Sequence, residues 1–220
     1  MKVLAFDCSG ASCSAAVLID DRPAAQRFVA MERGHAETLL PMIDTVLREA
    51  ALSPAALDLL AVTIGPGSFT GLRIGLAAAR GLVLARRLPA IGLTSFDAVK
   101  VDDAAAQPLF IALESKRAEL FLQRRDCADG RLPALVPPDE WPAILPPGRC
   151  YVAGDGAPRL TASLARADAL VLPGHGRPDP VALARLGLAR WRGGDRTPLA
   201  PLYLRAPDTT TPHQTAAVAP

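Results

Sequence analysis

The sequence predicts an α/β protein made of two related halves. Half of its 220 residues are hydrophobic, which is enough to build either one large core or two small ones. Short apolar runs of strand length alternate with longer stretches of helical periodicity. A strand hairpin followed by a helix occurs twice along the chain, and this recurrence favours two lobes over one.

The first half predicts an antiparallel meander followed by alternating helices and strands. Its expected strands cover residues 3–6, 14–19, 25–30, 60–64 and 89–93. The connections between the first three strands are short and rich in Asp, Ser and Gly, which favour turns. Apolar residues recur at helical spacing over residues 37–50 and 71–86, and a further helix is expected to begin at Ser95.

The second half is smaller and less regular. Its expected strands cover residues 109–113, 119–123, 150–153 and 169–172. The proline-rich stretch over residues 132–147 predicts irregular structure, whereas residues 180–191 have the spacing of a helix. After Arg205 the chain is mostly Thr, Pro and Ala, so we expect disorder there.

These elements predict a domain organisation. Three strands, a helix, a strand and a helix are the layout of one half of an actin-like protein. We expect residues 1–102 to form the first lobe, completed by a C-terminal helix at about residues 180–192. Residues 103–179 would form the smaller second lobe, and residues 206–220 a disordered tail.

Composition excludes several functional classes. The formal net charge of +2 is too small for a basic nucleic-acid-binding arm. No apolar run approaches the roughly 18 residues of a membrane span. Lys2 and Asp7 interrupt the N-terminus before a signal peptide could build up, so we expect a cytoplasmic protein without a membrane partner.

The cysteines and histidines do not have the spacing of a metal site. The four cysteines, Cys8, Cys13, Cys127 and Cys150, contain no C-x-x-C pair, and we expect them to be reduced and mostly buried. The three histidines, His35, His175 and His213, are far apart in sequence. We therefore expect no metal ion bound by this chain.

A glycine-rich loop over residues 65–75 joins a buried strand to a helix. Such a junction directs backbone N–H groups and the positive end of the helix dipole at whatever lies there, so phosphate binding is one interpretation. A tight turn that lets the helix pack closely is the other. The loop is neither a P-loop, since Leu72 follows Gly71 where a lysine would stand, nor a dinucleotide fingerprint, since Thr70 takes the third glycine position. The candidate phosphate or interface residues are Asp7, Ser9, Gly65, Gly67, Ser68, Phe69, Thr70, Gly71 and Arg73.

Arg73 would lie in the first turn of the second helix, where a cation opposes the helix dipole. A role in stability alone is therefore a weak explanation for this arginine. We expect it to pair with a carboxylate or a phosphate near an interface.

The first helix carries more apolar residues than one core contact needs. Met42 and Val46 lie off its main stripe, so the helix is either deeply buried or packed against another subunit. We expect these two side chains to be contacts rather than core. The full predicted partner interface is Leu39, Met42, Ile43, Val46, Leu72 and Leu76.

The glycine loop reads GPGSFTGLRIG, which resembles the signature of the TsaB (YeaZ) family. The opening Asp7-Cys8-Ser9 turn, the start of the first helix and the segment PLAPLYLR at residues 198–205 are similar to the same family. Residues 114–117 depart from the family's usual Asp-Ala-Arg-Arg. The resemblance covers nearly the whole chain, to about Asp208.

The resemblance implies an actin-like (ASKHA) fold of two related lobes, with mixed sheets flanked by helices. The family works with TsaD and TsaE to move a threonylcarbamoyl group from an adenylate onto an anticodon-loop adenosine of tRNA. It implies a heterodimer with a TsaD-like protein, contact with a TsaE-like ATPase and with tRNA through the complex, and a self-dimer when alone. It implies no cofactor of this chain's own, with ATP or ADP at the complex interface left as an alternative.

The resemblance also indicates a subunit without catalytic residues. TsaD-like proteins hold a metal with two histidines four residues apart, and Ser95 and Val99 stand at those positions here. Valine cannot bind a metal and serine is a poor ligand at neutral pH. The alternative is a stand-alone actin-fold ATPase, transferase or metallopeptidase homologue, in which Asp7 would orient a magnesium-bound nucleotide.

Overall fold

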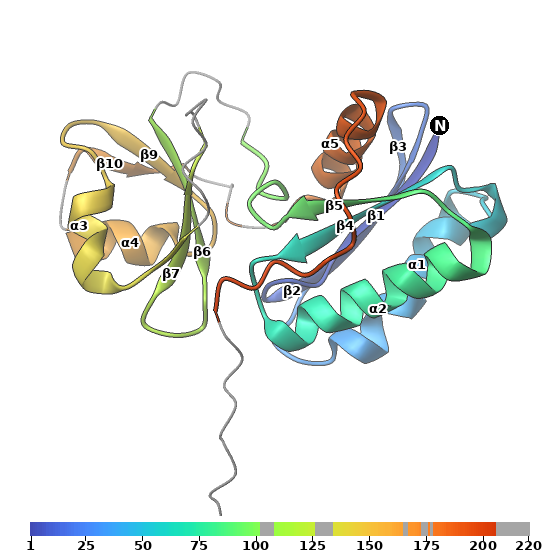
Figure 1. Cartoon of the computed structure of the whole chain (residues 1–220), viewed down its shortest axis with the longest axis horizontal. Coiled ribbons are helices and arrows are strands. Elements are labelled where there is room, and N and C mark those ends of the chain that lie inside the picture. Colours follow the sequence, from blue (N-terminus) through green and yellow to red (C-terminus); the bar gives the residue numbers. More distant parts are fainter. Residues whose placement is uncertain (102–107, 126–133, 165–166, 173–175, 177, 206–220) are drawn as a thin grey trace, which may run out of the picture.

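The computed structural model describes residues 1–101, 108–125, 134–164, 167–172, 176 and 178–205. Two lobes lie side by side, each built on a five-stranded mixed sheet (Figure 1). The expected lobe boundary at residues 102–103 and the expected tail at 206–220 lie outside the described residues. The prediction of an actin-like α/β architecture with two related lobes is confirmed.

The first sheet has the strand order β3-β2-β1-β4-β5. Its strands are β1 (Lys2–Asp7), β2 (Ser12–Ile19), β3 (Arg22–Ala30), β4 (Leu59–Gly65) and β5 (Ala90–Thr94). The first three strands pair antiparallel, as the meander prediction required, whereas β4 pairs parallel to both β1 and β5. The carboxyl ends of β1, β4 and β5 therefore meet at one edge, which faces the second lobe (Figure 1).

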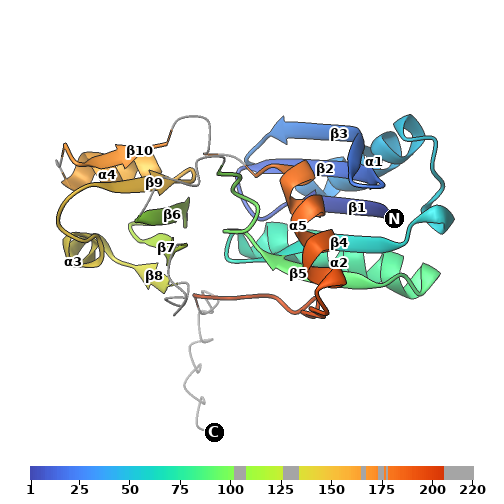
Figure 2. The ribbon, with the colours of Figure 1, turned by 90° about the horizontal axis from the view of Figure 1, so that it is seen from above.

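Helices cover both faces of the first sheet, which explains why β1 and β4 read as continuous apolar runs. Helices α1 (His35–Glu49) and α2 (Phe69–Arg86) pack on one face around Leu4, Phe6 and Val62. Helix α5 (Pro180–Arg192) packs on the opposite face around Val3, Ala5 and other side chains of the sheet (Figure 2). The last described helix thus returns to the first lobe.

The second sheet repeats the topology of the first. Its order is β10-β9-β6-β7-β8. The strands are β6 (Leu109–Glu114), β7 (Leu120–Arg124), β8 (Ala134–Val136), β9 (Cys150–Ala153) and β10 (Ala169–Val171). As in the first sheet, the first three strands pair antiparallel and the last two join in parallel.

Each face of the second sheet has a different neighbour. One face packs against helices α3 (Trp141–Ile144) and α4 (Ala157–Leu164). The other packs on Phe96 and Val99 of the connection that leaves β5, and on Leu204 near the end of the described chain. This second cluster is apolar and spans both lobes, so it helps to fix their relative position.

Three local predictions were wrong. Residues 95–98 form a turn rather than the expected helix, because the Asp97 carboxylate accepts hydrogen bonds from the Thr94 N–H and hydroxyl and closes the chain on itself. The stretch over residues 132–147 is not wholly irregular, since it holds β8, α3 and the short 3₁₀ turn Pro138–Glu140. Helix α4 was not predicted at all.

The segment that follows α5 runs back along the first lobe to the second (Figure 1). Gly92 N–H donates to Thr197 O at 2.9 Å, and Leu202 N–H donates to Ile64 O at 2.7 Å. Arg205 then forms an ion pair with Glu119 of the second lobe at 2.7 Å. Arg190 makes two hydrogen bonds to Asp97 and anchors α5 to the turn between the lobes.

Helix α2 begins directly against the β1–β2 turn. Ser68 is its N-cap, with its hydroxyl accepting from Gly71 N–H at 3.3 Å, and Ser68 N–H donates to Ser9 O at 2.7 Å. The carbonyl oxygens of Ser9 and Cys8 lie where a Cβ would stand at Gly67 and Gly71. Any larger residue at these two positions would push the turn and the helix apart.

We predict that Gly71→Ala lowers the free energy of unfolding by about 1–3 kcal/mol or more, because the new methyl group would overlap the Cys8 carbonyl. Gly81→Ala, in the same helix, is the matched control. Nothing lies within 4 Å of a Cβ there, so it should gain about 0.5–1 kcal/mol from helix propensity. Urea denaturation of both variants measures the contrast, and equal effects would disprove the packing role.

Candidate functional site

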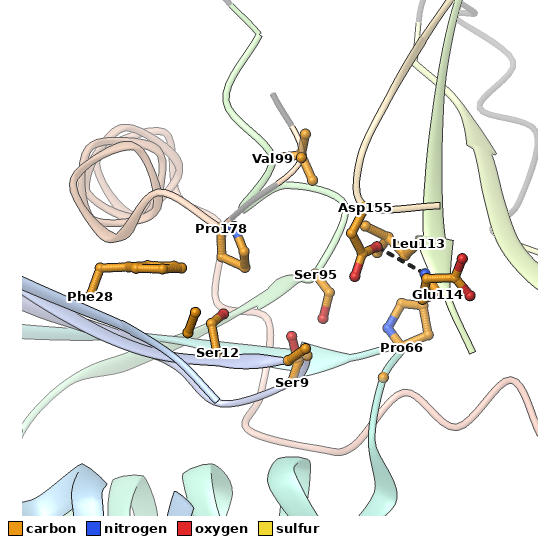
Figure 3. A pocket seen from close by; sticks show the side chains of 15 residues that line it. Ser9, Ser12, Phe28, Pro66, Ser95, Val99, Leu113, Glu114, Asp155 and Pro178 are labelled. Carbon is orange, nitrogen blue, oxygen red and sulfur yellow. Dashed lines mark hydrogen bonds between the residues drawn. The ribbon is translucent and has the colours of Figure 1, made fainter. Parts of the chain in front are cut away.

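A pocket of about 210 Å³ lies between the two lobes (Figure 3). The first lobe contributes the β1–β2 turn, the loop after β4 and the turn after β5, and the second lobe contributes the ends of β6 and β9. The principal lining residues are Ser9, Ser12, Phe28, Pro66, Ser95, Val99, Leu113, Glu114, Asp155 and Pro178. The pocket thus sits where the carboxyl ends of the strands meet, the usual position for a ligand in an open α/β sheet.

Asp7 ends β1 and lies fully buried beneath this pocket. Its Oδ1 accepts hydrogen bonds from Ser9 N–H at 3.1 Å, Ser9 Oγ at 2.6 Å and Thr63 Oγ1 at 2.5 Å. Its Oδ2 has no hydrogen-bond partner among the described residues. Burial raises the pKa of Asp7 above its ordinary value, although these hydrogen bonds oppose the shift.

Three serine hydroxyls near Asp7 are also buried without a described partner, those of Ser12, Ser14 and Ser95. Ser14 stands directly opposite Asp7 in the β1–β2 ladder, and Ser12 lies two residues along the same face of β2. Ser95 follows β5 and faces Ser9 and Ser12 across the pocket (Figure 3). The floor of the pocket is therefore polar and incompletely hydrogen-bonded.

Two acidic residues form the side of the pocket that belongs to the second lobe. Glu114 makes two hydrogen bonds to the Arg159 guanidinium, at 2.9 and 2.7 Å. Asp155 Oδ1 accepts the Glu114 backbone N–H at 2.9 Å (Figure 3). Among the described lining residues, both charged side chains are acids, so the pocket presents negative charge.

The glycine loop uses its backbone donors within the chain. Ser68 N–H donates to Ser9 O, Gly71 N–H to the Ser68 hydroxyl, and the Cys8 carbonyl covers Gly71. These contacts occupy the space a phosphate would need, so they favour the tight-turn interpretation of the loop. Of the candidate loop residues, Ser9 and Gly67 line the pocket, Asp7 is buried below it and Gly65 ends β4. Thr70 is exposed on the first turn of α2.

Within the described part of the chain, Arg73 contacts aromatic side chains. Its guanidinium lies 3.8 Å from the centre of the Phe69 ring, and its Nε is 3.5 Å from the Tyr203 hydroxyl. The rings of Phe69 and Tyr203 are 5.0 Å apart. This arginine therefore helps to hold the C-terminal segment against α2, and its expected pairing with a carboxylate or a phosphate near an interface stays a prediction.

The six side chains of the predicted partner interface are all buried inside this chain, and the interface itself stays a prediction. They are Leu39, Met42, Ile43, Val46, Leu72 and Leu76. Met42 and Val46, expected as contacts, are only 6% and 0% exposed. They are buried because α1 packs against β2, β3 and α2 at once, so its core-facing arc is wider than one stripe.

An apolar groove nevertheless runs between α1 and α2 on the outer surface. Its lining includes Ala36, Leu40, Ile74, Ala77, Ala78, Gly81 and Leu82. Leu40 is 57% exposed, and Leu84 of α2 is 85% exposed. Leu39 of the predicted interface also lines this groove. Sequence reasoning did not select the other residues of the groove, although the exposed Leu40 lies within residues 37–50, which were used to predict the helix.

Thiol and imidazole groups do not form a metal centre in the described part of the chain. Cys8, Cys13 and Cys150 are free and buried, as predicted, whereas Cys127 lies outside the described residues. The sulfur atoms of Cys8 and Cys13 are 3.5 Å apart. No three His, Cys, Asp or Glu side chains group as metal ligands within the described ranges. His35 instead has its Nε2 at 3.2 Å from Gly10 O and supports the β1–β2 turn.

The pocket offers hydrogen bonding rather than an obvious reaction. Ser95 and Val99 line it at the positions where the resemblance places catalytic histidines. Sequence reasoning did not identify Ser12, Phe28, Leu113 or Asp155 as pocket residues. The strand-end position of Ser12 was the available signal, but the contribution of the second lobe depends on how the lobes meet.

We predict that Asp7→Asn becomes more stabilising, relative to the parent chain, as pH rises. Because the pKa of Asp7 is raised in the folded state, folded Asp7 keeps its proton at pH values where unfolded Asp7 has lost it. The free energy of unfolding of the parent chain therefore falls as pH rises from the unfolded-state pKa to the folded-state pKa. Asparagine keeps an acceptor oxygen and has no charge to desolvate. Urea denaturation at acidic and neutral pH measures the difference, with the exposed Asp139→Asn as control. A pH-independent difference would contradict the assignment.

Comparison with known proteins identifies relatives across most of the chain. The family model described as tRNA N6-adenosine threonylcarbamoyltransferase, TsaD, matches residues 29–128. An uncharacterized protein of Mycobacterium tuberculosis is 33% identical over 183 residues, which cover 83% of this chain and 81% of that protein. The tRNA threonylcarbamoyladenosine biosynthesis protein TsaB of Escherichia coli is 39% identical over 95 residues, covering 43% of this chain and 41% of that protein.

Solved structures of other proteins share the fold of this chain. A protein described as similar to peptidase YEAZ from Pseudomonas aeruginosa superposes with a TM-score of 0.77 and 26% identity, covering 93% of this chain and 99% of that one. An ADPNP-bound activator of a dehydratase from Clostridium difficile has a TM-score of 0.54 at 8% identity and shares only the fold. These relatives, together with the shared topology and the glycine loop, show that the chain belongs to the TsaB (YeaZ) family.

Proposed function

We propose that this chain is a non-catalytic subunit in the biosynthesis of threonylcarbamoyladenosine in tRNA. It would assemble with a TsaD-like protein, which transfers the threonylcarbamoyl group from threonylcarbamoyl-AMP to the N6 of an anticodon-loop adenosine, and would work with a TsaE-like ATPase. Relatives named TsaB biosynthesis protein support the pathway. The observation that carries the assembly role is the exposed apolar groove between α1 and α2.

The groove has the properties of a protein interface. The groove has a volume of about 480 Å³ and is lined by alanine, glycine, leucine and isoleucine. The small residues allow another helix to approach closely. Asp44 and Arg48 form an exposed ion pair at 2.8 Å, one and two turns beyond Leu40 on α1, and would supply part of a polar rim. A helix pair of a TsaD-like protein, which resembles this fold, would present a matching surface. A second copy of this chain would compete for the same surface.

The chain's own groups support a role without catalysis. Ser95 and Val99 replace the metal-binding histidines of TsaD-like proteins, and Val99 is fully buried. We propose that the subunit instead stabilises the competent conformation of its partner, which is a shift in the partner's population. Such an effect requires tighter binding to the active state than to the inactive one.

The alternative, a stand-alone actin-fold ATPase, has a specific obstacle. The start of α2 is covered by the carbonyls of Cys8 and Ser9, which occupy the space that a phosphate would need. We therefore propose no cofactor held by this chain alone. ATP or ADP would bind, if at all, at the interface of the complex, and tRNA would bind through the complex.

The proposed setting is the cytoplasm, where the tRNA substrate is found. Within the described ranges no helix is both long enough and apolar enough to cross a bilayer. The reduced Cys8, Cys13 and Cys150 suit a reducing compartment.

We predict that Leu40→Glu weakens binding to a TsaD-like protein roughly tenfold or more, because it places a charge in the apolar groove. The free energy of unfolding should change by less than about 0.5 kcal/mol, since Leu40 is 57% exposed. Leu170→Glu on β10 is the matched control, an exposed leucine of the second lobe. Titration calorimetry measures the affinity of each variant for the TsaD-like protein. Loss of binding in Leu170→Glu alone would place the interface elsewhere.

We also predict that this chain alone transfers nothing but is required for transfer by the complex. The experiment combines threonylcarbamoyl-AMP, tRNA and the TsaD-like and TsaE-like proteins, with and without this chain. Modified adenosine, measured by mass spectrometry of digested tRNA, should appear only in the complete mixture. Full modification without this chain would refute the proposed function, and transfer by this chain alone would support the enzymatic alternative.

A further inference from the structure

The pocket between the lobes contains hydroxyl groups that lack partners. Ser12 and Ser95 are 3% and 4% exposed, and neither hydroxyl has a hydrogen-bond partner among the described residues. Ser12 begins β2 and Ser95 follows β5, yet both face the same space, together with Ser9 (Figure 3). A buried hydroxyl without a partner destabilises a protein, so a partner from outside the described residues is expected.

The charge at the mouth of the pocket selects the kind of partner. Arg159 neutralises Glu114 through two hydrogen bonds, whereas Asp155 accepts backbone N–H groups, including that of Glu114, and pairs with no described cation. Burial raises the pKa of Asp155 above its ordinary value, because its charge is poorly solvated. The lining of this pocket therefore carries one carboxylate without a cationic partner, and Lys116 lines the adjoining part of the cleft. The charge of this carboxylate attracts an ammonium group and disfavours phosphate or carboxylate ligands.

The remaining lining sets the size and the apolar part of the ligand. Phe28, Val99 and Pro178 form a wall beside the serines (Figure 3). A volume of about 210 Å³ holds roughly seven waters, or one small organic molecule. A molecule the size of an amino alcohol fits this space.

We propose that the interlobe pocket binds a small amino alcohol, a ligand with one ammonium group and at least one hydroxyl group. The ammonium lies against Asp155, the hydroxyl hydrogen-bonds with Ser12 and Ser95, and the carbon skeleton rests on Phe28. This site is distinct from the groove between α1 and α2, so the inference goes beyond the proposed assembly role.

Both lobes contribute to the site, so occupancy would bias their relative position. Asp155 belongs to the second lobe, whereas Ser12 and Ser95 belong to the first. The hydroxyls of Ser12 and Ser95 are shielded from solvent, so a small opening between the lobes admits the ligand. A ligand that bridges them then stabilises the closed arrangement.

The test uses three probes of nearly equal size in amide NMR titrations of the labelled full chain. Serinol is a propanediol with an amino group, glycerol has a hydroxyl in its place, and glycerate supplies a carboxylate. We expect saturable shifts at the amides of Ser12 and Ser95 with serinol, and roughly five- to tenfold weaker binding with glycerol. Equal or tighter binding of glycerate would overturn the charge argument. No saturable shift with any probe would mean that water completes these hydrogen bonds, which overturns the proposal.

Two variants separate ligand binding from structure. Asp155→Asn keeps the oxygen that accepts the Glu114 N–H, so the fold should persist while the preference for serinol over glycerol disappears. Ser95→Ala should weaken both probes, because both use the hydroxyl. Asp139→Asn, an exposed acid of the same lobe, is the control and should change neither. A retained serinol preference in Asp155→Asn would overturn the assignment of the ammonium site.

Discussion

The close contact between the β1–β2 turn and the start of α2 is the constraint on which the other features depend. The carbonyl oxygens of Cys8 and Ser9 occupy the space that side chains at Gly71 and Gly67 would need. This contact fixes the first turn of α2 under the sheet edge. The β1–β2 turn also places Ser9 above Asp7. The contact thus positions both the floor of the pocket and helix α2, which forms one side of the α1–α2 groove.

Most of the first lobe could be predicted because its signals are local. Apolar runs of strand length gave the five strands of the first sheet, and short turns gave the meander that β1, β2 and β3 form. The expected helix at Ser95 failed because the Asp97 side chain closes a turn with Thr94, a competition that apolar spacing does not report. Helix α4 has apolar residues at helical spacing, Ala157, Leu160 and Leu164, but it was missed because eight residues are shorter than the window in which such a pattern is recognised.

The candidate sites were harder to predict because both depend on contacts between distant segments. The apolar arc of α1 is wide because it meets β2, β3 and α2, not because a partner covers it. Periodicity alone cannot distinguish these causes, so buried Met42 was expected on the surface while exposed Leu40 was not selected. Asp155 reaches the pocket only through the second lobe, whose placement no local pattern specifies.

The two lobes share more than their strand order. In the first lobe, the loop between β4 and α2 packs its glycines on the end of β1 and the turn that follows. In the second, Gly154 lies against the Ala112 carbonyl of β6, and Gly156 N–H donates to the same oxygen at 3.0 Å. In both lobes the strand-to-helix loop is therefore held by a carbonyl of this chain, in a place where an actin-like nucleotide site would present free donors to phosphate. The same packing that fills this space also fixes each loop to its own sheet, which suits the proposed role in assembly.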